Sequence, residues 1–103
     1  MYINSLCIYY YHNGIVSETY NYVNGLREGR VEIFFPSGDL NMKGVYSQDK
    51  LHGFSEFYYD ITKELEAKGK YLIGVKDSVW VFYSESGDTL KSIDYRVLDL
   101  KKE

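Results

Sequence analysis

The glycines of this chain recur at a fixed interval. All nine fall into four series whose members are separated by 24 or 25 residues, or by twice that interval. These series are Gly14, Gly38 and Gly87; Gly25 and Gly74; Gly29 and Gly53; and Gly44 and Gly69. Self-similarity at a period of about 20 to 50 residues is typical of repeat proteins, in which each unit buries its apolar surface against its neighbours. The period therefore predicts a chain of small, similar units.

Aromatic residues follow the same period. Tyrosine recurs at Tyr22, Tyr46, Tyr71 and Tyr95, and aromatic pairs recur at 10–11, 34–35 and 58–59. We divide the chain into units at about 6–29, 30–53, 54–78 and 79–95, followed by a C-terminal tail at 96–103. A chain of 103 residues is short enough to form one domain, so we expect residues 1–103 to be a single repeat domain.

Each unit is predicted to contain two strands, because β-formers alternate with polar residues between turn signals. The first strands are expected at 6–11, 30–35, 54–59 and 79–84. The second strands are expected at 15–22, 39–46, 64–71 and 88–95. We therefore predict an all-β fold, a single elongated, curved antiparallel meander of about eight strands built from hairpin repeats. A short helical turn is expected only at 97–102.

Alternation also assigns the two faces of the predicted sheet. One face, called the core face, is almost wholly apolar and carries Cys7, Tyr9, Tyr11, Val16, Tyr20, Tyr22, Val31, Ile33, Phe35, Leu40, Met42, Tyr46, Ser55, Phe57, Tyr59, Leu65, Ala67, Tyr71, Trp80, Phe82, Ile93 and Tyr95. The other, called the polar face, carries Arg30, Glu32, Phe34, Asn41, Lys43, Glu56, Tyr58, Glu66, Lys68 and Lys70. Burial of the rings on the core face is expected to stabilise the fold most.

Composition excludes several classes of partner. The chain has 15 acidic and 12 basic residues, a net charge of −3, and no long run of like charge, so we expect no nucleic-acid partner. Scattered lysines likewise disfavour a lipid surface. No apolar run approaches the roughly 20 residues needed to span a bilayer, and the N-terminus lacks the pattern of a signal peptide. Because the lone Cys7 suits a reducing compartment, we expect a cytoplasmic protein.

No catalytic, cofactor or metal site is predicted. His12 and His52 fall in separate turns, which is not the arrangement of a nucleophile and base or of a metal pair. Cys7 falls on the core face, where a thiol behaves as a small hydrophobic group. The neighbouring carboxylates Glu64 and Glu66 alternate with lysines, as on a solvated strand. We therefore expect that the chain is not an enzyme.

The spacing of aromatic and glycine residues resembles the MORN repeat and its bacterial variant in the YwqK-type antitoxin family. The resemblance rests on 10–14 with Tyr22 and 25–29, on 34–38 with Tyr46 and 49–53, and on 79–83 with Gly87 and Tyr95. The third copy departs from the pattern, with Thr62 and Ser78 in glycine positions. This resemblance covers about residues 6 to 95. It implies a hairpin-repeat fold and an immunity or antitoxin-type protein that binds and silences a partner.

Four aromatic residues occupy the same position of successive units on the polar face. This aromatic ladder consists of Tyr10, Phe34, Tyr58 and Tyr83, whose members are expected about two strand spacings, or roughly 9.5 Å, apart. One interpretation is that these rings brace neighbouring strands. The other is that they bind a protein partner, with a polar rim of Arg30, Glu32, Glu56, Lys68 and Lys70. A second candidate surface is formed by charged residues of the connecting loops, Arg27-Glu28, Asp49-Lys50 and Lys76-Asp77.

Two functional hypotheses follow. The first is a non-catalytic protein-binding module of the antitoxin type, which neutralises a cognate protein toxin. The alternative is a structural or scaffold module that uses the open edges of its sheet to join copies of itself or a larger assembly. The first hypothesis requires an exposed recognition surface on a face or loop edge, whereas the alternative requires an exposed sheet edge.

Overall fold

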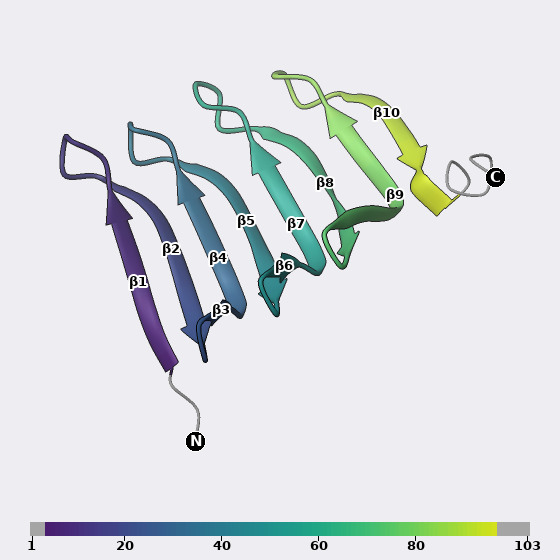
Figure 1. Cartoon of the computed structure of the whole chain (residues 1–103). Coiled ribbons are helices and arrows are strands. Elements are labelled where there is room, and N and C mark those ends of the chain that lie inside the picture. The colour runs from purple at the N-terminus through teal and green to yellow at the C-terminus, as the bar shows by residue number, and fades with distance from the viewer. Residues whose placement is uncertain (1–3, 97–103) are drawn as a thin grey trace.

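The computed structural model describes residues 4–96, and these residues form one antiparallel sheet (Figure 1). The strands within this part of the chain are β1 (Asn4–Tyr10), β2 (Val16–Val23), β3 (Leu26–Arg27), β4 (Gly29–Phe34), β5 (Leu40–Ser47), β6 (Lys50–Leu51), β7 (Gly53–Tyr58), β8 (Leu65–Leu72), β9 (Val75–Tyr83) and β10 (Thr89–Asp94). Eight of them lie side by side in chain order, while β3 pairs with β2 and β6 pairs with β5. The predicted all-β meander is confirmed. The helical turn expected at 97–102 lies outside the described residues.

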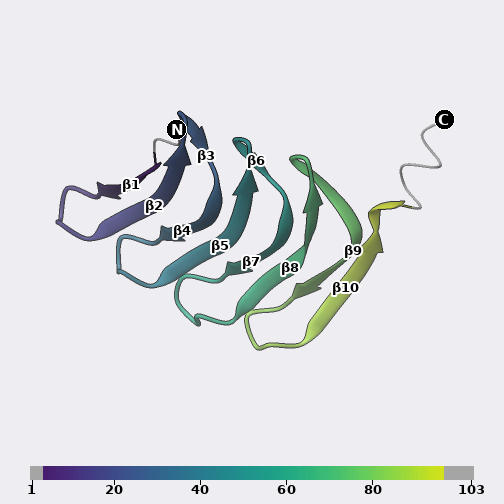
Figure 2. The same cartoon turned by 90° about the horizontal axis from the view of Figure 1, so that it is seen from below.

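The sheet is open and forms a thin plate of 41 × 37 × 16 Å. Figure 2 shows the successive hairpins following one another in a row, with β1 at one end and β10 at the other. Within residues 4–96 no second layer covers either face, and the two end strands each have one neighbour. The repeat therefore stabilises the fold mainly through contacts between adjacent hairpins, as expected of stacked units.

The first, second and fourth hairpin turns repeat with the same two backbone hydrogen bonds. In the first hairpin the Tyr11 N–H donates to the Ile15 carbonyl at 2.8 Å, and the Gly14 N–H donates to the Tyr11 carbonyl at 3.0 Å. Gly14 has a φ of 85°, a conformation that side chains with a Cβ rarely adopt. In the third hairpin Lys63 takes the left-handed conformation with a φ of 63°, because the extra residue there moves the turn past Thr62.

In the first three hairpins a β-bulge places one residue on the opposite face of the sheet from the one predicted by simple alternation. The ladder residues Tyr10, Phe34 and Tyr58 pair with Val16, Leu40 and Leu65, and in each case the register shifts next to that pair. Cross-strand partners lie on the same face, so these three aliphatic residues belong to the polar face and not to the core face. The extra residue in the second strand inverts the alternation. Glu66, expected on the polar face, lines a recess with Ala67 and Trp80 on the core face.

The core is a row of side chains along the centre of the core face. The buried apolar residues are Tyr20, Val31, Met42, Ala67 and Trp80, with Ser55 as the buried polar residue. Tyr20 packs edge-on against Tyr9 and Tyr46, with ring centres 6.1 and 6.0 Å apart. Aromatic pairs of this geometry contribute about 0.5–1.5 kcal/mol beyond the area they bury.

Trp80 is the most enclosed side chain of the core. Its exposed fraction is 0%, and its indole N–H donates to the Lys70 carbonyl at 2.9 Å. A methyl group at Gly69 would collide with the Trp80 ring atoms Cγ, Cδ2 and Cε2. Gly69 therefore leaves the space that the indole occupies, which is a different role from that of the turn glycines.

Candidate binding surface

A shallow hollow of about 720 Å³ lies on the polar face. Strands β4, β5, β7, β8 and β9 contribute to it, so it is built from more than one unit of the repeat. Its lining consists of Arg30, Val31, Glu32, Lys43, Gly44, Val45, Phe54, Ser55, Glu56, Lys68, Gly69, Val79 and Val81. The backbone ladder fixes where the Cβ atoms of these residues lie on the sheet.

The apolar part of the hollow includes Phe54, Val45 and Val79. These side chains have exposed fractions of 74%, 38% and 47% respectively. Phe54 lies on β7, which pairs with β5 on one side and with β8 on the other. Its cross-strand partner on β8 is Lys70. Exposed aromatic and aliphatic side chains that lie together, rimmed by charges, are typical of sites that bind another protein.

A row of alternating charges crosses the same hollow. Glu32 pairs with Lys43, Lys43 pairs with Glu56, and Glu56 pairs with Lys68 on successive strands. The Lys43 Nζ lies 3.2 Å from Glu56 Oε1, and the Tyr58 hydroxyl donates to the same oxygen at 3.0 Å. Opposite charges on cross-strand partners favour this register of the sheet.

The environment of Glu56 favours its ionised form. Partial burial raises its pKa, but hydrogen bonds from Tyr58 and Lys43 and the charges of Lys43 and Lys68 together bring the pKa below its ordinary value. The hydrogen bond to Glu56 also raises the pKa of Lys43. Burial and the same carboxylate raise the pKa of Tyr58, so the neutral phenol persists as a donor.

Positive charge exceeds negative charge on this surface. The row contains Glu32 and Glu56 against Lys43 and Lys68. Arg30 and Lys70 are the register partners of Val45 and Phe54, and Lys70 is also paired with Asp77 of β9. Although the whole chain has a net charge of −3, four basic and three acidic residues give this part of the polar face a net charge of +1. A partner with carboxylates around an apolar contact would match it.

The structure brings together part of the predicted rim. The hollow is lined by four of these residues, Arg30, Glu32, Glu56 and Lys68. The fifth, Lys70, is the cross-strand partner of Phe54 but does not line the hollow. The aromatic ladder of Tyr10, Phe34, Tyr58 and Tyr83 does not line it.

The ladder residues are differently exposed. Tyr10, on the end strand, has an exposed fraction of 61%, while Phe34, Tyr58 and Tyr83 are half-buried. The Tyr58 hydroxyl bonds Glu56, and Lys68 Nζ lies 5.9 Å from the centre of the Tyr83 ring. The half-buried rings of Tyr58 and Tyr83 therefore contact side chains of their own sheet, as expected if the ladder braces neighbouring strands.

The sequence did not predict that Phe54, Val45, Val79 and Lys43 would line one binding surface. Phe54 occupies the position of Arg30 and Val79 in the neighbouring units, so no aromatic repeat marks it. The available signal was a large ring on the same strand face as Glu56, at the position where the preceding unit has Arg30. The physical neighbours of Phe54 come from other strands and are set by register.

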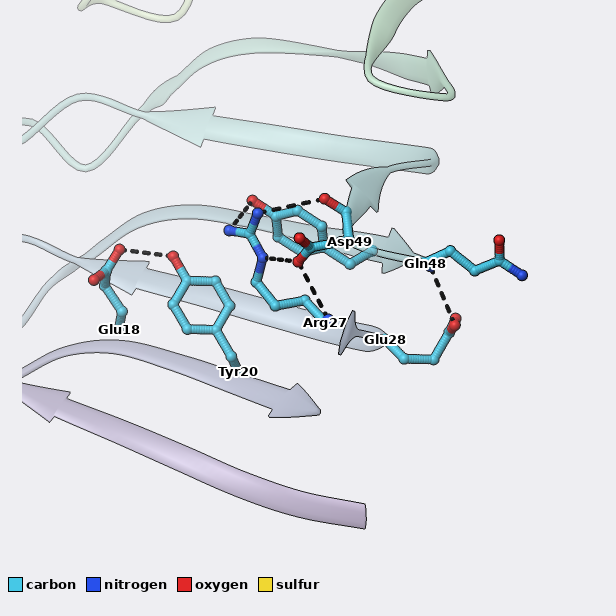
Figure 3. Close-up of polar contacts among 7 residues, drawn as sticks. Glu18, Tyr20, Arg27, Glu28, Gln48 and Asp49 are labelled. Carbon is cyan, nitrogen blue, oxygen red and sulfur yellow. Dashed lines mark hydrogen bonds and ion pairs between the residues drawn. The ribbon is translucent and has the colours of Figure 1, made fainter. Parts of the chain in front are cut away.

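Charged side chains of one connecting loop bind residues of the next loop. Figure 3 shows Arg27 of β3 reaching Asp49, with its Nε 2.6 Å from Asp49 Oδ1. One guanidinium nitrogen also donates to the Tyr46 hydroxyl at 3.1 Å, and the guanidinium carbon lies 4.3 Å from the centre of the Tyr46 ring. Hydrogen bonding from Arg27 lowers the pKa of Asp49. The first two loops are therefore joined by an arginine clasp.

Residues of the third connecting loop also contact neighbouring units. Lys76 Nζ lies 5.0 Å from the centre of the Trp80 ring, a cation–π distance. His52, one of the two histidines considered as a site residue, accepts the Ile73 N–H through Nδ1 at 3.2 Å. These contacts assign the loop charges a role in joining successive units, and they weaken the loops as a candidate recognition surface.

The described residues form no group of three or more His, Cys, Asp or Glu side chains able to hold a metal ion. Cys7 is a half-buried free thiol on β1. Residues 4–96 also contain no helix with the length and apolar character needed to cross a bilayer.

Comparison of the chain with protein-family models, with curated proteins and with solved structures finds no match. The resemblance to MORN-variant repeats therefore stays a prediction made from residue spacing.

Proposed function

We propose that this chain is a non-catalytic protein-binding module whose partner docks in the hollow of the polar face. The observation that carries the proposal is Phe54, a ring with an exposed fraction of 74% on an inner strand of the sheet. An exposed ring held by a rigid backbone offers contact area at low cost in side-chain entropy. Val45 and Val79 extend the apolar contact on either side.

The charges around Phe54 specify the chemistry of the partner. Arg30 and Lys70 flank the apolar residues, and Lys43 and Lys68 are joined to Glu56 in the charged row. The matching partner presents an apolar side chain surrounded by carboxylates, so that its charges meet the basic rim. The resemblance to YwqK-type antitoxins makes this partner a protein toxin, which the module neutralises inside the cell.

Affinity capture tests the proposal. The full chain, a Phe54→Asp variant and an Ile61→Asp control are immobilised and exposed to extract of the organism that encodes the chain. Ile61 is a matched control, because it is 88% exposed but lies in a hairpin turn outside the hollow. We expect a protein that the wild type and the control capture equally and that Phe54→Asp captures at least tenfold less.

The purified partner then gives the dissociation constants of the three chains. Capture that is equal for all three would remove the hollow from consideration. Inhibition of the captured protein's activity by the wild-type chain tests the antitoxin role separately, because a partner that stays fully active in the complex contradicts neutralisation.

The scaffold alternative has its own support. Strand β1 lies at an open end of the sheet and exposes Leu6, Ile8 and Tyr10. In this second function the module joins other chains through the edge of its sheet, which the polar-face hollow does not require.

A further inference from the structure

The free edge of β1 lacks the usual protection against pairing with another strand. Its seven residues, 4–10, include no charged residue, no proline and no glycine. The opposite end strand, β10, contains Lys91 and Asp94 within six residues. Charged residues on an edge strand discourage edge-to-edge association, so the two ends of this sheet differ in kind.

Within residues 4–96, the outward-facing backbone groups of β1 that have no partner strand belong to the same residues as its exposed apolar side chains. The Tyr11 N–H and C=O are both bonded within the first hairpin, toward β2. Backbone groups alternate in direction along a strand, so those of Leu6, Ile8 and Tyr10 point away from β2. The side chains of these three residues have exposed fractions of 66%, 43% and 61%. A strand added at this edge would satisfy the backbone and cover the apolar side chains together.

We propose that β1 pairs antiparallel with β1 of a second copy of this chain, joining two sheets into one. This inference rests on the scaffold alternative and specifies the edge, the partner and the register. Full overlap of residues 4–10 places Asn4 opposite Tyr10 and Leu6 opposite Ile8 of the second copy. Cys7 lies on the two-fold axis, opposite the same residue of the other chain. The interface is isologous and closes at two copies.

A second copy suits this edge better than an unrelated strand, because β1 is self-complementary. Reversal about Cys7 exchanges Leu6 with Ile8, two aliphatic residues of similar volume, so these apolar side chains meet in both halves, while Tyr10 meets the uncharged Asn4. Because β1 has no charged residue, the pairing places no like charges opposite each other, which would destabilise it. The same axis keeps the two core faces on one side of the joined sheet.

Sedimentation velocity of the full chain over a range of concentrations tests the association. We expect a monomer–dimer equilibrium whose dissociation constant rises at least tenfold in Ile8→Lys, because two lysines then enter the apolar contact. Ser92→Lys is the matched control, an exposed position on the opposite end strand, and should leave the dissociation constant unchanged. If circular dichroism shows that Ile8→Lys is unfolded, Leu6→Lys at the more exposed position replaces it.

Cysteine cross-linking tests the register. Residues directly opposite in an antiparallel pair have Cα atoms about 4.5–5.5 Å apart, within the range that a disulfide spans. Copper phenanthroline, as the oxidant, should therefore join two Cys7 thiols into a covalent dimer that dithiothreitol reverses. The double variant Cys7→Ser with Ser5→Cys should not cross-link, because position 5 lies opposite Tyr9 of the second copy in this register.

The outcomes separate the inference from the functions proposed above. A monomer at every concentration overturns both β1 pairing and self-association as the scaffold function, and leaves the hollow unaffected. A dimer that Ser92→Lys dissociates and Ile8→Lys does not overturns β1 as the edge, while the scaffold alternative survives. Cross-linking by the position-5 cysteine but not by Cys7 overturns the register.

Discussion

Substitution of Gly69 by alanine should destabilise the protein far more than substitution of Gly44, although both glycines occupy the same position of the repeat. A methyl group at Gly69 collides with three atoms of the Trp80 indole, which is completely buried. Carbon atoms pack at about 3.5–4.0 Å, so the ring must shift by about 1 Å or more. Tyr71 and Phe57 surround it, with ring centres 5.0 and 6.1 Å from that of Trp80.

The magnitude follows from the contacts that the shift breaks. Overpacking of a filled core costs about 1–3 kcal/mol, and loss of the indole hydrogen bond to the Lys70 carbonyl costs about 1 kcal/mol more. The lower entropy of the unfolded alanine chain offsets about 0.4–1 kcal/mol. We therefore expect Gly69→Ala to lower the free energy of unfolding by about 2 kcal/mol, within a range of about 1–3.5 kcal/mol.

Gly44→Ala is the control. Its methyl group would lie 2.6 Å from Ser55 Oγ and 3.0 Å from Met42 Cε. The Ser55 hydroxyl has no hydrogen-bond partner and can rotate away, and Met42 Cε is the flexible end of its side chain. The expected loss is about 1 kcal/mol or less, which leaves a difference of about 1 kcal/mol or more from the central value for Gly69→Ala.

Urea denaturation followed by circular dichroism measures both variants, with equal m-values as the check that the free energies can be compared. Trp80→Leu in the Gly69→Ala background should relieve the collision, so the loss in the double variant should be smaller than the sum of the two single losses by at least about 1 kcal/mol. Equal losses for Gly69→Ala and Gly44→Ala, or additive losses in the double variant, would refute the role assigned to Gly69.

Two further predictions concern pH. Because a hydrogen bond from Arg27 lowers the pKa of Asp49, the clasp stabilises the folded state above the ordinary value of 3.8, and this stabilisation is lost as the pH falls through the lowered pKa. Asp49→Asn should therefore reduce the fall in unfolding free energy below about pH 4, and an unchanged acid profile in urea denaturation would contradict the clasp. Burial and the hydrogen bond to Glu18 raise the pKa of Tyr20 well above 10.0, so the stability that this phenol contributes is complete below 10.0 and declines as the pH rises past it. Tyr20→Phe should make that alkaline decline shallower, and a decline as steep as that of the wild type would show that Tyr20 does not titrate as proposed.

The period of the sequence was sufficient to place most strands. Expected strands at 30–35 and 39–46 are observed as β4 (Gly29–Phe34) and β5 (Leu40–Ser47), because alternation and turn residues act over a few positions. The two-residue strands β3 and β6 were not expected. Their pairing occurs within the connecting loops, where Arg27 contacts Asp49 of the next loop, and a single sequence does not mark such partners.

The candidate site was predicted only in part. Arg30, Glu32, Glu56 and Lys68 were expected to surround a binding surface, and they line the hollow. The apolar contact was expected from the aromatic ladder, whereas the exposed ring in the hollow is Phe54. Periodicity draws attention to residues that repeat, and Phe54 is aromatic in one unit alone.

The sequence by itself determined that the chain forms one antiparallel sheet of repeated hairpins with an aromatic core, because period, alternation and turn residues are local properties. Tertiary structure decided which glycines make turns and which leave room for a neighbour. Gly14 adopts a positive φ, whereas Gly69 lies under the Trp80 ring. It also decided that Leu40 leaves the core face and that Phe54 shares a hollow with Val79. Bulges and the register between units depend on backbone hydrogen bonds formed by the whole sheet, so neighbours across strands emerge only when the strands pair.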